Sequence, residues 1–314
     1  PDPGPNPDPN PDPNPDPNPD PDPNPNSDPN PNPDQVRATW AKFSQGKAAP
    51  RLDVLVCNAG VLLNELTLTS ERVEVTFACH LLFGTYLLGK LALPALEATA
   101  GGRLVVVSSG GMYNSKFPSW ETAASLEGEF SGNLAYAFAK RGQVLLCERW
   151  AEEHPAVKFV SCHPGWTATP AVDAAYGDMK KYLEPMRSPW QGADGIAWLC
   201  VVDAAALQSG AFYLDRKVGP KHIAGPFFTE GKYTKNTRAE VDAMMLRLDE
   251  WSGGRRPAEA DEAEALALRS PLKESATPVE VSKFMGRWFV IAQLTLTLTL
   301  NPNPNPNPNP NPNP

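Results

Sequence analysis

Gly102-Arg-Leu-Val-Val-Val-Ser-Ser109 decides the fold class, because it is a short apolar run that ends in small polar residues. Runs of the same kind occur at 52–57, 157–162 and 210–215. Each is typical of a buried strand, and stretches with helical spacing separate them, at 71–98, 134–154 and 189–205. Apolar strands that alternate with helices predict an α/β fold, with a doubly wound parallel sheet of about four strands and flanking helices.

Chemistry-bearing residues follow these strands, at the sheet edge where open parallel sheets bind ligands. Asn58-Ala59-Gly60 follows the first strand, Ser108-Ser109 the second and His163-Pro164-Gly165 the third. The helix between the second and third strands places Tyr136 and Lys140 one turn apart on one face. Taken alone, Tyr-x-x-x-Lys also fits a solvated helix face with a packed tyrosine, and Ser109 also fits a turn-capping serine.

In this order, the motifs closely resemble the short-chain dehydrogenase/reductase family over about residues 36–225. The wording of Ser108–Met112, Glu148–Trp150 and His163–Trp166 looks like its member-12-like branch. The resemblance implies a Rossmann-like fold and an NAD- or NADP-dependent interconversion of a carbonyl and an alcohol on an apolar small molecule. It implies the catalytic residues Ser109, Tyr136 and Lys140. It implies the cofactor-binding residues Asn58, Ala59, Gly60, Tyr136, Lys140, Pro164, Gly165 and Thr169.

The chemistry explains why these residue types are needed. Carbonyl reduction requires a proton donor, and a tyrosine can serve when its pKa falls from about 10 towards neutral, as a nearby lysine ammonium favours. Ser109 would donate a hydrogen bond to the substrate oxygen. By resemblance, Lys140 would hold the nicotinamide ribose and Asn58–Gly60 the adenine-ribose side. Pro164-Gly165 and Thr169 would fix the carboxamide, which leaves His163 as a packed residue rather than a metal ligand.

Two departures from the family pattern stand out. Leu81 occupies the position of the usual asparagine, three residues before Gly84, and His80 lies beside it. Before Val36 we find neither three earlier strands nor the Thr-Gly-x-x-x-Gly-x-Gly turn that binds pyrophosphate. We therefore expect an incomplete sheet with strand 52–57 as an apolar edge, and impaired cofactor binding. The alternative is a non-catalytic reductase fragment formerly fused to a lipid-binding lipocalin.

Composition sets both ends of the chain apart. Residues 1–34 hold 16 of the 36 prolines, eight Asp and no Lys or Arg, so they carry the whole net charge of −8. Residues 301–314 repeat Asn-Pro. Such segments cannot form helices or ladders and are predicted to be disordered. Because Leu-Thr and Asn-Pro are two reading frames of the hexanucleotide CTAACC, we interpret both tails as translated simple repeats; a solvated spacer and a binding repeat are the alternatives.

After the first tail we predict four further segments. They are a partial reductase domain at 35–230, a helical linker at 231–277, a lipocalin-like fragment at 278–293 and a low-complexity tail at 294–314. The linker would contain exposed, charge-mixed helices at 235–251 and 257–268. The lipocalin-like fragment rests on Gly286-Arg-Trp288-Phe with flanking apolar residues, and an amphipathic terminal strand is the alternative.

Charge and cysteine usage narrow the partners. Without the first tail the chain is neutral, which argues against nucleic acid or an anionic membrane surface. The five cysteines form no Cys-x-x-Cys pair, so we expect neither disulfides nor a metal site, and a reducing cytoplasmic location fits. The apolar run 75–96 is interrupted by polar residues and proline and is predicted to be a buried helix rather than a membrane span. By resemblance, helices 71–98 and 134–154 could join copies into a homo-oligomer.

Overall fold

The computed structural model describes residues 32–44, 50–169, 172, 181, 183–223 and 232–253. The predictions for the first tail up to residue 31, for helix 257–268, for the lipocalin-like fragment and for the low-complexity tail lie outside the described residues.

A five-stranded sheet in the order β1-β2-β3-β4-β5 forms the centre of the molecule. The first four strands are parallel: β1 (Val54–Cys57), β2 (Arg103–Val107), β3 (Lys158–Cys162) and β4 (Phe212–Leu214). This confirms the predicted α/β class with its four parallel strands. A short fifth strand, β5 (Lys217–Gly219), pairs antiparallel with β4. Its turn residues Asp215 and Arg216 both have positive φ without being glycine, so the sequence carried no usual hairpin signal.

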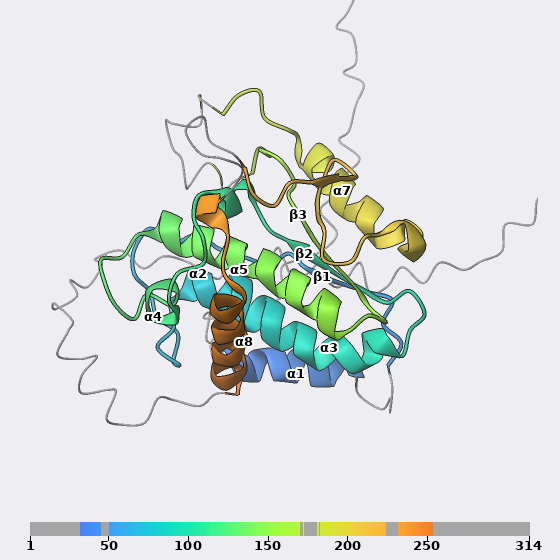
Figure 1. Cartoon of the computed structure of the whole chain (residues 1–314), viewed down its shortest axis with the longest axis horizontal. Coiled ribbons are helices and arrows are strands. Elements are labelled where there is room, and N and C mark those ends of the chain that lie inside the picture. The colour runs from blue at the N-terminus through green and yellow to red at the C-terminus, as the bar shows by residue number, and fades with distance from the viewer. Residues whose placement is uncertain are drawn as a thin grey trace, which may run out of the picture.

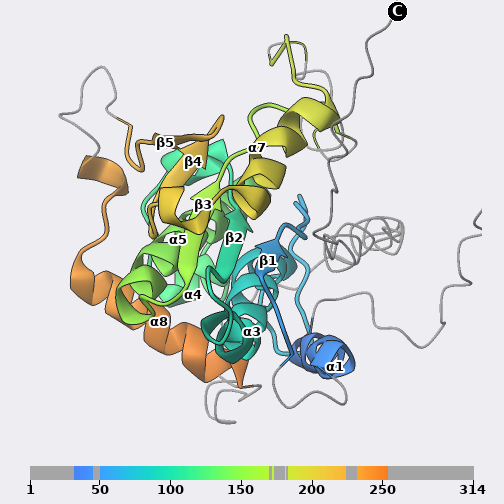
Figure 2. The same cartoon turned by 90° about the vertical axis from the view of Figure 1, so that its right-hand side faces the viewer.

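Two helical layers enclose the sheet. On one face lie α2 (Val75–Phe77), the π-helical η1 (Ala78–Leu87), α3 (Leu88–Glu97) and α5 (Gly132–Glu153). The other face carries α7 (Pro189–Val201), as Figure 2 shows. β2 is buried along its whole length, with Leu104 and Val106 in the core under α5 and Val105 and Val107 in the core under α7. Because both faces of β2 are buried, successive residues Leu104–Val107 are all apolar.

The predicted helix 71–98 is composite. It begins at Val75, where the Glu74 carboxylate accepts the Thr76 and Phe77 N–H groups, and it continues past Pro94 to Glu97. Gly84 fits the π-helical winding, because a Cβ there would stand 1.9 Å from the Cys79 carbonyl oxygen. Residues 75–97 are long and apolar enough to cross a membrane, but 78% of their most apolar window is buried inside the fold. This is the interior helix that the sequence predicted.

Further helices surround this framework. α1 (Pro33–Ser44) precedes β1, and α8 (Arg238–Ser252) lies across the outer side of α5 and η1 (Figure 1). The expectation that helix 235–251 is exposed is wrong, because Met244, Leu248 and Trp251 of α8 are buried in the main core. Shorter elements are η2 (Gly110–Tyr113), α4 (Trp120–Ala123), η4 (Ala204–Ala206) and η5 (Lys232–Thr234). The predicted helix 189–205 ends earlier, at Val201, because the backbone is extended at Val202, and η4 is a separate turn.

Candidate active site

The two serines after β2 have different environments. Ser108 is buried, and its hydroxyl donates to the Lys140 carbonyl at 2.9 Å, which ties the end of β2 to α5. Ser109 is only partly buried, and its Oγ accepts the Gly111 N–H at 3.1 Å to cap η2. The capping bond uses a lone pair and leaves the O–H proton of Ser109 as a donor. The second serine is therefore the one suited to donate to a ligand.

Tyr136 and Lys140 lie one turn apart on α5, as their spacing predicted. Lys140 is buried, and its Nζ donates to the Val107 carbonyl at 2.8 Å and lies 5.4 Å from the centre of the Tyr136 ring. Burial lowers the pKa of Lys140 from 10.5 to about 7, against a smaller opposing effect of the Cys79 and Cys162 thiols. Both charge states of this amine are therefore accessible near neutral pH.

Gly111 marks the point where Ser109 and Tyr136 meet. A Cβ at this glycine would stand 3.7 Å from Ser109 Oγ and 3.2 Å from Tyr136 Cε1. The serine from the end of β2 and the phenol ring from α5 thus border the same small space, with the Lys140 amine beside the ring. The structure therefore brings the three residues Ser109, Tyr136 and Lys140 together.

Asn58-Ala59-Gly60 follows β1 and borders the same region through His80 of η1. A Cβ at Gly60 would stand 1.8 Å from His80 Cε1, so the imidazole packs directly on the glycine backbone. The His80 ring meets the Tyr136 ring edge to face, with 5.2 Å between centroids and 84° between planes. Of the three residues of the turn, Ala59 is exposed and the other two are partly buried. This turn is therefore joined to Tyr136 by one buried side chain.

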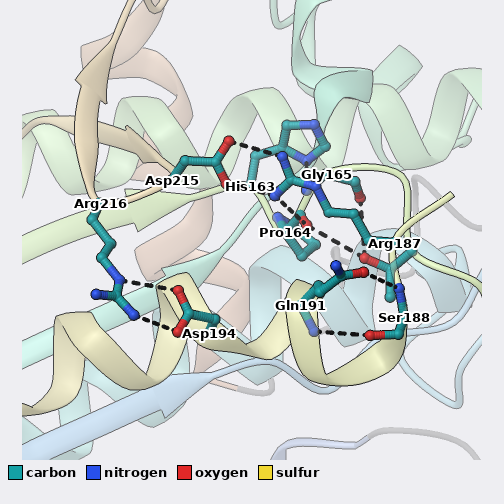
Figure 3. Close-up of polar contacts among 10 residues, drawn as sticks. His163, Pro164, Gly165, Arg187, Ser188, Gln191, Asp194, Asp215 and Arg216 are labelled. Atoms are coloured by element: carbon teal, nitrogen blue, oxygen red, sulfur yellow. Dashed lines mark hydrogen bonds and ion pairs between the residues drawn. The ribbon is translucent and has the colours of Figure 1, made fainter. Parts of the chain in front are cut away.

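His163-Pro164-Gly165 follows β3, and Figure 3 shows Arg187 lying over this turn. The Arg187 guanidinium donates to both carboxylate oxygens of Asp215, at 2.6 and 2.8 Å, and to the Pro164 carbonyl. Two observations favour glycine at position 165. Its φ of 78° lies in the left-handed region, and a Cβ there would stand 2.5 Å from Arg187 Nε. The turn is held by an arginine from a distant segment.

His163 packs at the end of β3. Its Nδ1 accepts the Gly165 N–H, and a Cβ at Gly110 would stand 3.4 Å from its Nε2. Burial and, to a lesser extent, the charge of Arg187 lower the pKa of His163 to about 4. Thr169, further along, accepts a hydrogen bond from the Val172 N–H. Within the described ranges, no group of three or more His, Cys, Asp or Glu is placed to hold a metal ion.

Two neighbours of the candidate site, His80 and Arg187, were not predicted from the sequence. His80 carried a weak signal, since it lies one position before the residue where the family pattern has asparagine. Arg187 carried none, because its partners Pro164 and Asp215 lie 23 and 28 residues away and only the fold brings them together.

Comparisons with known proteins find similar sequences for part of this chain. Residues 31–180 match the family model described as short chain dehydrogenase. A human protein named dehydrogenase/reductase SDR family member 12 is 41% identical over 186 residues, which cover 59% of this chain and 58% of the relative. Its Bos taurus counterpart is 39% identical over 189 residues, with coverage of 60% and 59%. The chain thus spans less than two thirds of these relatives' length.

A solved structure was also compared with this chain. The 3-alpha-hydroxysteroid dehydrogenase from Pseudomonas sp. B-0831, complexed with NADH, superposes with a TM-score of 0.45 at 21% identity, over 58% of this chain and 77% of the other.

Proposed function

We propose that this chain, whose residues 31–180 match the family model described as short chain dehydrogenase, interconverts a carbonyl and an alcohol on a small apolar molecule with a nicotinamide cofactor. The observation that carries the proposal is the meeting of Ser109 and Tyr136 beside Gly111, with the Lys140 amine 5.4 Å from the phenol ring. A hydroxyl donor, a phenol and an amine in one partly buried space are the groups that carbonyl reduction needs.

In this mechanism Ser109 donates its hydroxyl proton in a hydrogen bond to the substrate oxygen and so fixes the substrate's orientation. Tyr136 donates its phenolic proton to the same oxygen as negative charge develops there. The protonated Lys140 amine stabilises the phenolate that results, and its low pKa allows it to return a proton to that phenolate and to be reprotonated from solvent for the next turnover. Ser108 holds α5 against β2, which keeps the distance between these groups constant.

A nicotinamide cofactor, when bound, would supply the hydride. The residues at the strand ends suit its nicotinamide-ribose half: Lys140 would hold the ribose hydroxyls, Asn58-Ala59-Gly60 would line the cleft, and Pro164-Gly165 with Thr169 would face the carboxamide. His80 Nδ1, which packs on the Gly60 backbone, is a buried polar atom without a hydrogen-bond partner among the described residues of this region. The 314 residues include no Thr-Gly-x-x-x-Gly-x-Gly turn, so we propose that this polypeptide binds the dinucleotide weakly.

Tyr136→Phe tests the proposal. With NADH or NADPH at high concentration and benzaldehyde or decanal as probes, we expect the variant to lose about 10²–10⁴-fold in kcat, because the phenolic proton donor is removed while the ring remains. The measurement is the initial rate of nicotinamide oxidation. Tyr233→Phe is the matched control, since this tyrosine lies on η5 and donates to the Tyr113 carbonyl.

Equal turnover in wild type and Tyr136→Phe would contradict the catalytic role of the phenol. Absence of turnover in wild type at saturating cofactor would favour the non-catalytic alternative.

We place the protein in the cytoplasm. All five cysteines, Cys57, Cys79, Cys147, Cys162 and Cys200, are free thiols, which a reducing compartment preserves. Its proposed partners are the cofactor and an apolar carbonyl or alcohol.

A further inference from the structure

The His80 side chain lies between two parts of the candidate site, the turn after β1 and the Tyr136 ring. Its side chain is 4% exposed. One side of the ring packs on Gly60, where a Cβ would stand 1.8 Å from Cε1 and 2.4 Å from Nδ1. The Tyr136 ring lies against it edge to face at 5.2 Å. The imidazole is therefore the direct physical connection between the turn after β1 and the phenol on α5.

The hydrogen bonds of His80 fix its tautomer and its position. Nε2 lies 2.9 Å from the Val61 carbonyl oxygen, and because a carbonyl only accepts, Nε2 carries the proton. The His80 backbone carbonyl accepts from the Gln143 side-chain amide and the Thr85 hydroxyl. Both ends of the residue are thus anchored, and Nδ1 is left as a bare acceptor.

The surroundings of the ring keep it uncharged. Burial lowers the pKa of His80 well below 6.5, and the nearby positive charge of Lys140 lowers it further, while the bond to Val61 acts weakly in the opposite direction. A neutral imidazole packs against the Tyr136 ring without adding a second positive charge beside the Lys140 amine.

We propose that His80, as a neutral Nε2–H imidazole, is a positioning residue that fixes the Tyr136 ring against the Asn58-Ala59-Gly60 turn. The proposal rests on the proposed reductase function for its catalytic consequence, but the contacts themselves are independent of turnover. The hydrogen bond to Val61 sets the depth of the imidazole, and the imidazole edge sets the orientation of the phenol towards Ser109.

Two substitutions separate positioning from packing. His80→Leu fills similar space but loses the bond to Val61, whereas His80→Asn can restore a donor to Val61 without the ring. With NADPH and the aldehyde probes, we expect His80→Leu to lower kcat about tenfold or more with little change in KM, and His80→Asn to recover most of that loss. His154→Leu, at the end of α5, is the matched histidine control. Equal losses in Asn and Leu variants, or a change confined to KM, would refute the positioning role.

Measurements without substrate or cofactor distinguish this proposal from the proposed function. In the full-length chain, NMR of labelled histidine should show His80 protonated at Nε2 and unchanged across the pH range in which ordinary histidines titrate. The two edges of the Tyr136 ring should give separate signals in wild type and averaged signals in His80→Leu. A titrating His80, or a Tyr136 ring that already flips freely in wild type, would overturn the proposal even if the chain is active.

A paired substitution tests the contact between His80 and Gly60 directly. Gly60→Ala should lower the unfolding temperature in the wild-type background, because its methyl group would collide with the imidazole, and should have little effect when combined with His80→Ala. Gly195→Ala in α7, where a Cβ meets open space, is the control. Equal effects of Gly60→Ala in the two backgrounds would show that His80 does not press on the turn.

Discussion

Lys140 combines a structural burden with a chemical use. Its amine is buried at 3% exposure, and the Val107 carbonyl is its hydrogen-bond acceptor. A buried ammonium is costly, so burial lowers the pKa of this group to about 7. The same burial that weakens the fold brings the pKa of the amine near neutral, which suits the proton-transfer role that we propose for it beside Tyr136. Stability and proton transfer therefore oppose each other at one residue.

Lys140→Met should reveal this opposition as a pH-dependent gain in stability. Above the unfolded-state pKa of about 10.4, lysine is neutral in both states and burial of its charge costs nothing. As the pH falls from there to about 7, the unfolded chain binds a proton that the folded chain does not, so wild-type stability falls relative to the variant. Below about 7 the difference levels off. We expect the variant to be about 2 kcal/mol more stable there, after allowing for the lost hydrogen bond.

Urea unfolding of both proteins across this pH range measures the difference. Lys217→Met, at an exposed position on β5, is the control and should show no such trend. A difference between Lys140→Met and wild type that stays constant with pH would contradict the buried-amine explanation.

Elements whose residues follow one local hydrophobic pattern could be predicted from the sequence. Elements that depend on contacts between distant residues could not. β2 and β3 are mostly apolar runs and α5 has long helical spacing, so their positions follow from local sequence. The order of the motifs also predicted that Ser109, Tyr136 and Lys140 lie close together. By contrast, β5 depends on an Asp-Arg turn with positive φ, and Arg187 finds its partner 28 residues away. Neither leaves a local signal.

α8 shows how charge can hide a buried face. Met244, Leu248 and Trp251 recur at helical spacing and enter the core, and the Trp251 ring lies 5.7 Å from that of Trp120. The charged residues between them favour an exposed linker helix when the sequence is taken alone. A capping box at Thr237 and Glu240 fixes where the helix begins.

The packing of α8 predicts a clear contrast between two leucines on the same helix. Leu248→Ala should destabilise the protein by about 2–4 kcal/mol, because it leaves a cavity in the main core. Leu246→Ala, at 60% exposure, should change stability by less than about 0.5 kcal/mol. Chemical unfolding followed by tryptophan fluorescence measures both. Similar effects of the two substitutions would show that α8 is not docked as described.

At the level of the whole molecule, α8 changes which surface remains for partners. The helices that the family resemblance assigned to self-association, around η1–α3 and α5, are covered on their outer side by α8 and bordered by α1 (Figure 1). Ion pairs, most of them exposed on both sides, fasten α8 at its edges; they include Lys90–Asp249, Arg149–Asp242, Arg238–Glu152 and Arg247–Glu121. Such pairs contribute little each, so the apolar stripe of α8 provides most of the attachment. Association through this face would first require α8 to leave.

Displacing α8 should therefore expose an apolar surface through which copies of the chain associate. Leu248→Glu places a charge in the core beneath α8 and should detach the helix, exposing the apolar layer that contains Tyr86 and Trp150. We expect sedimentation velocity to show concentration-dependent association of this variant and no association of the wild type through this face. Leu246→Glu, on the exposed side, should sediment like wild type. A wild-type dimer that Leu248→Glu dissociates would instead show that α8 itself forms the contact between copies.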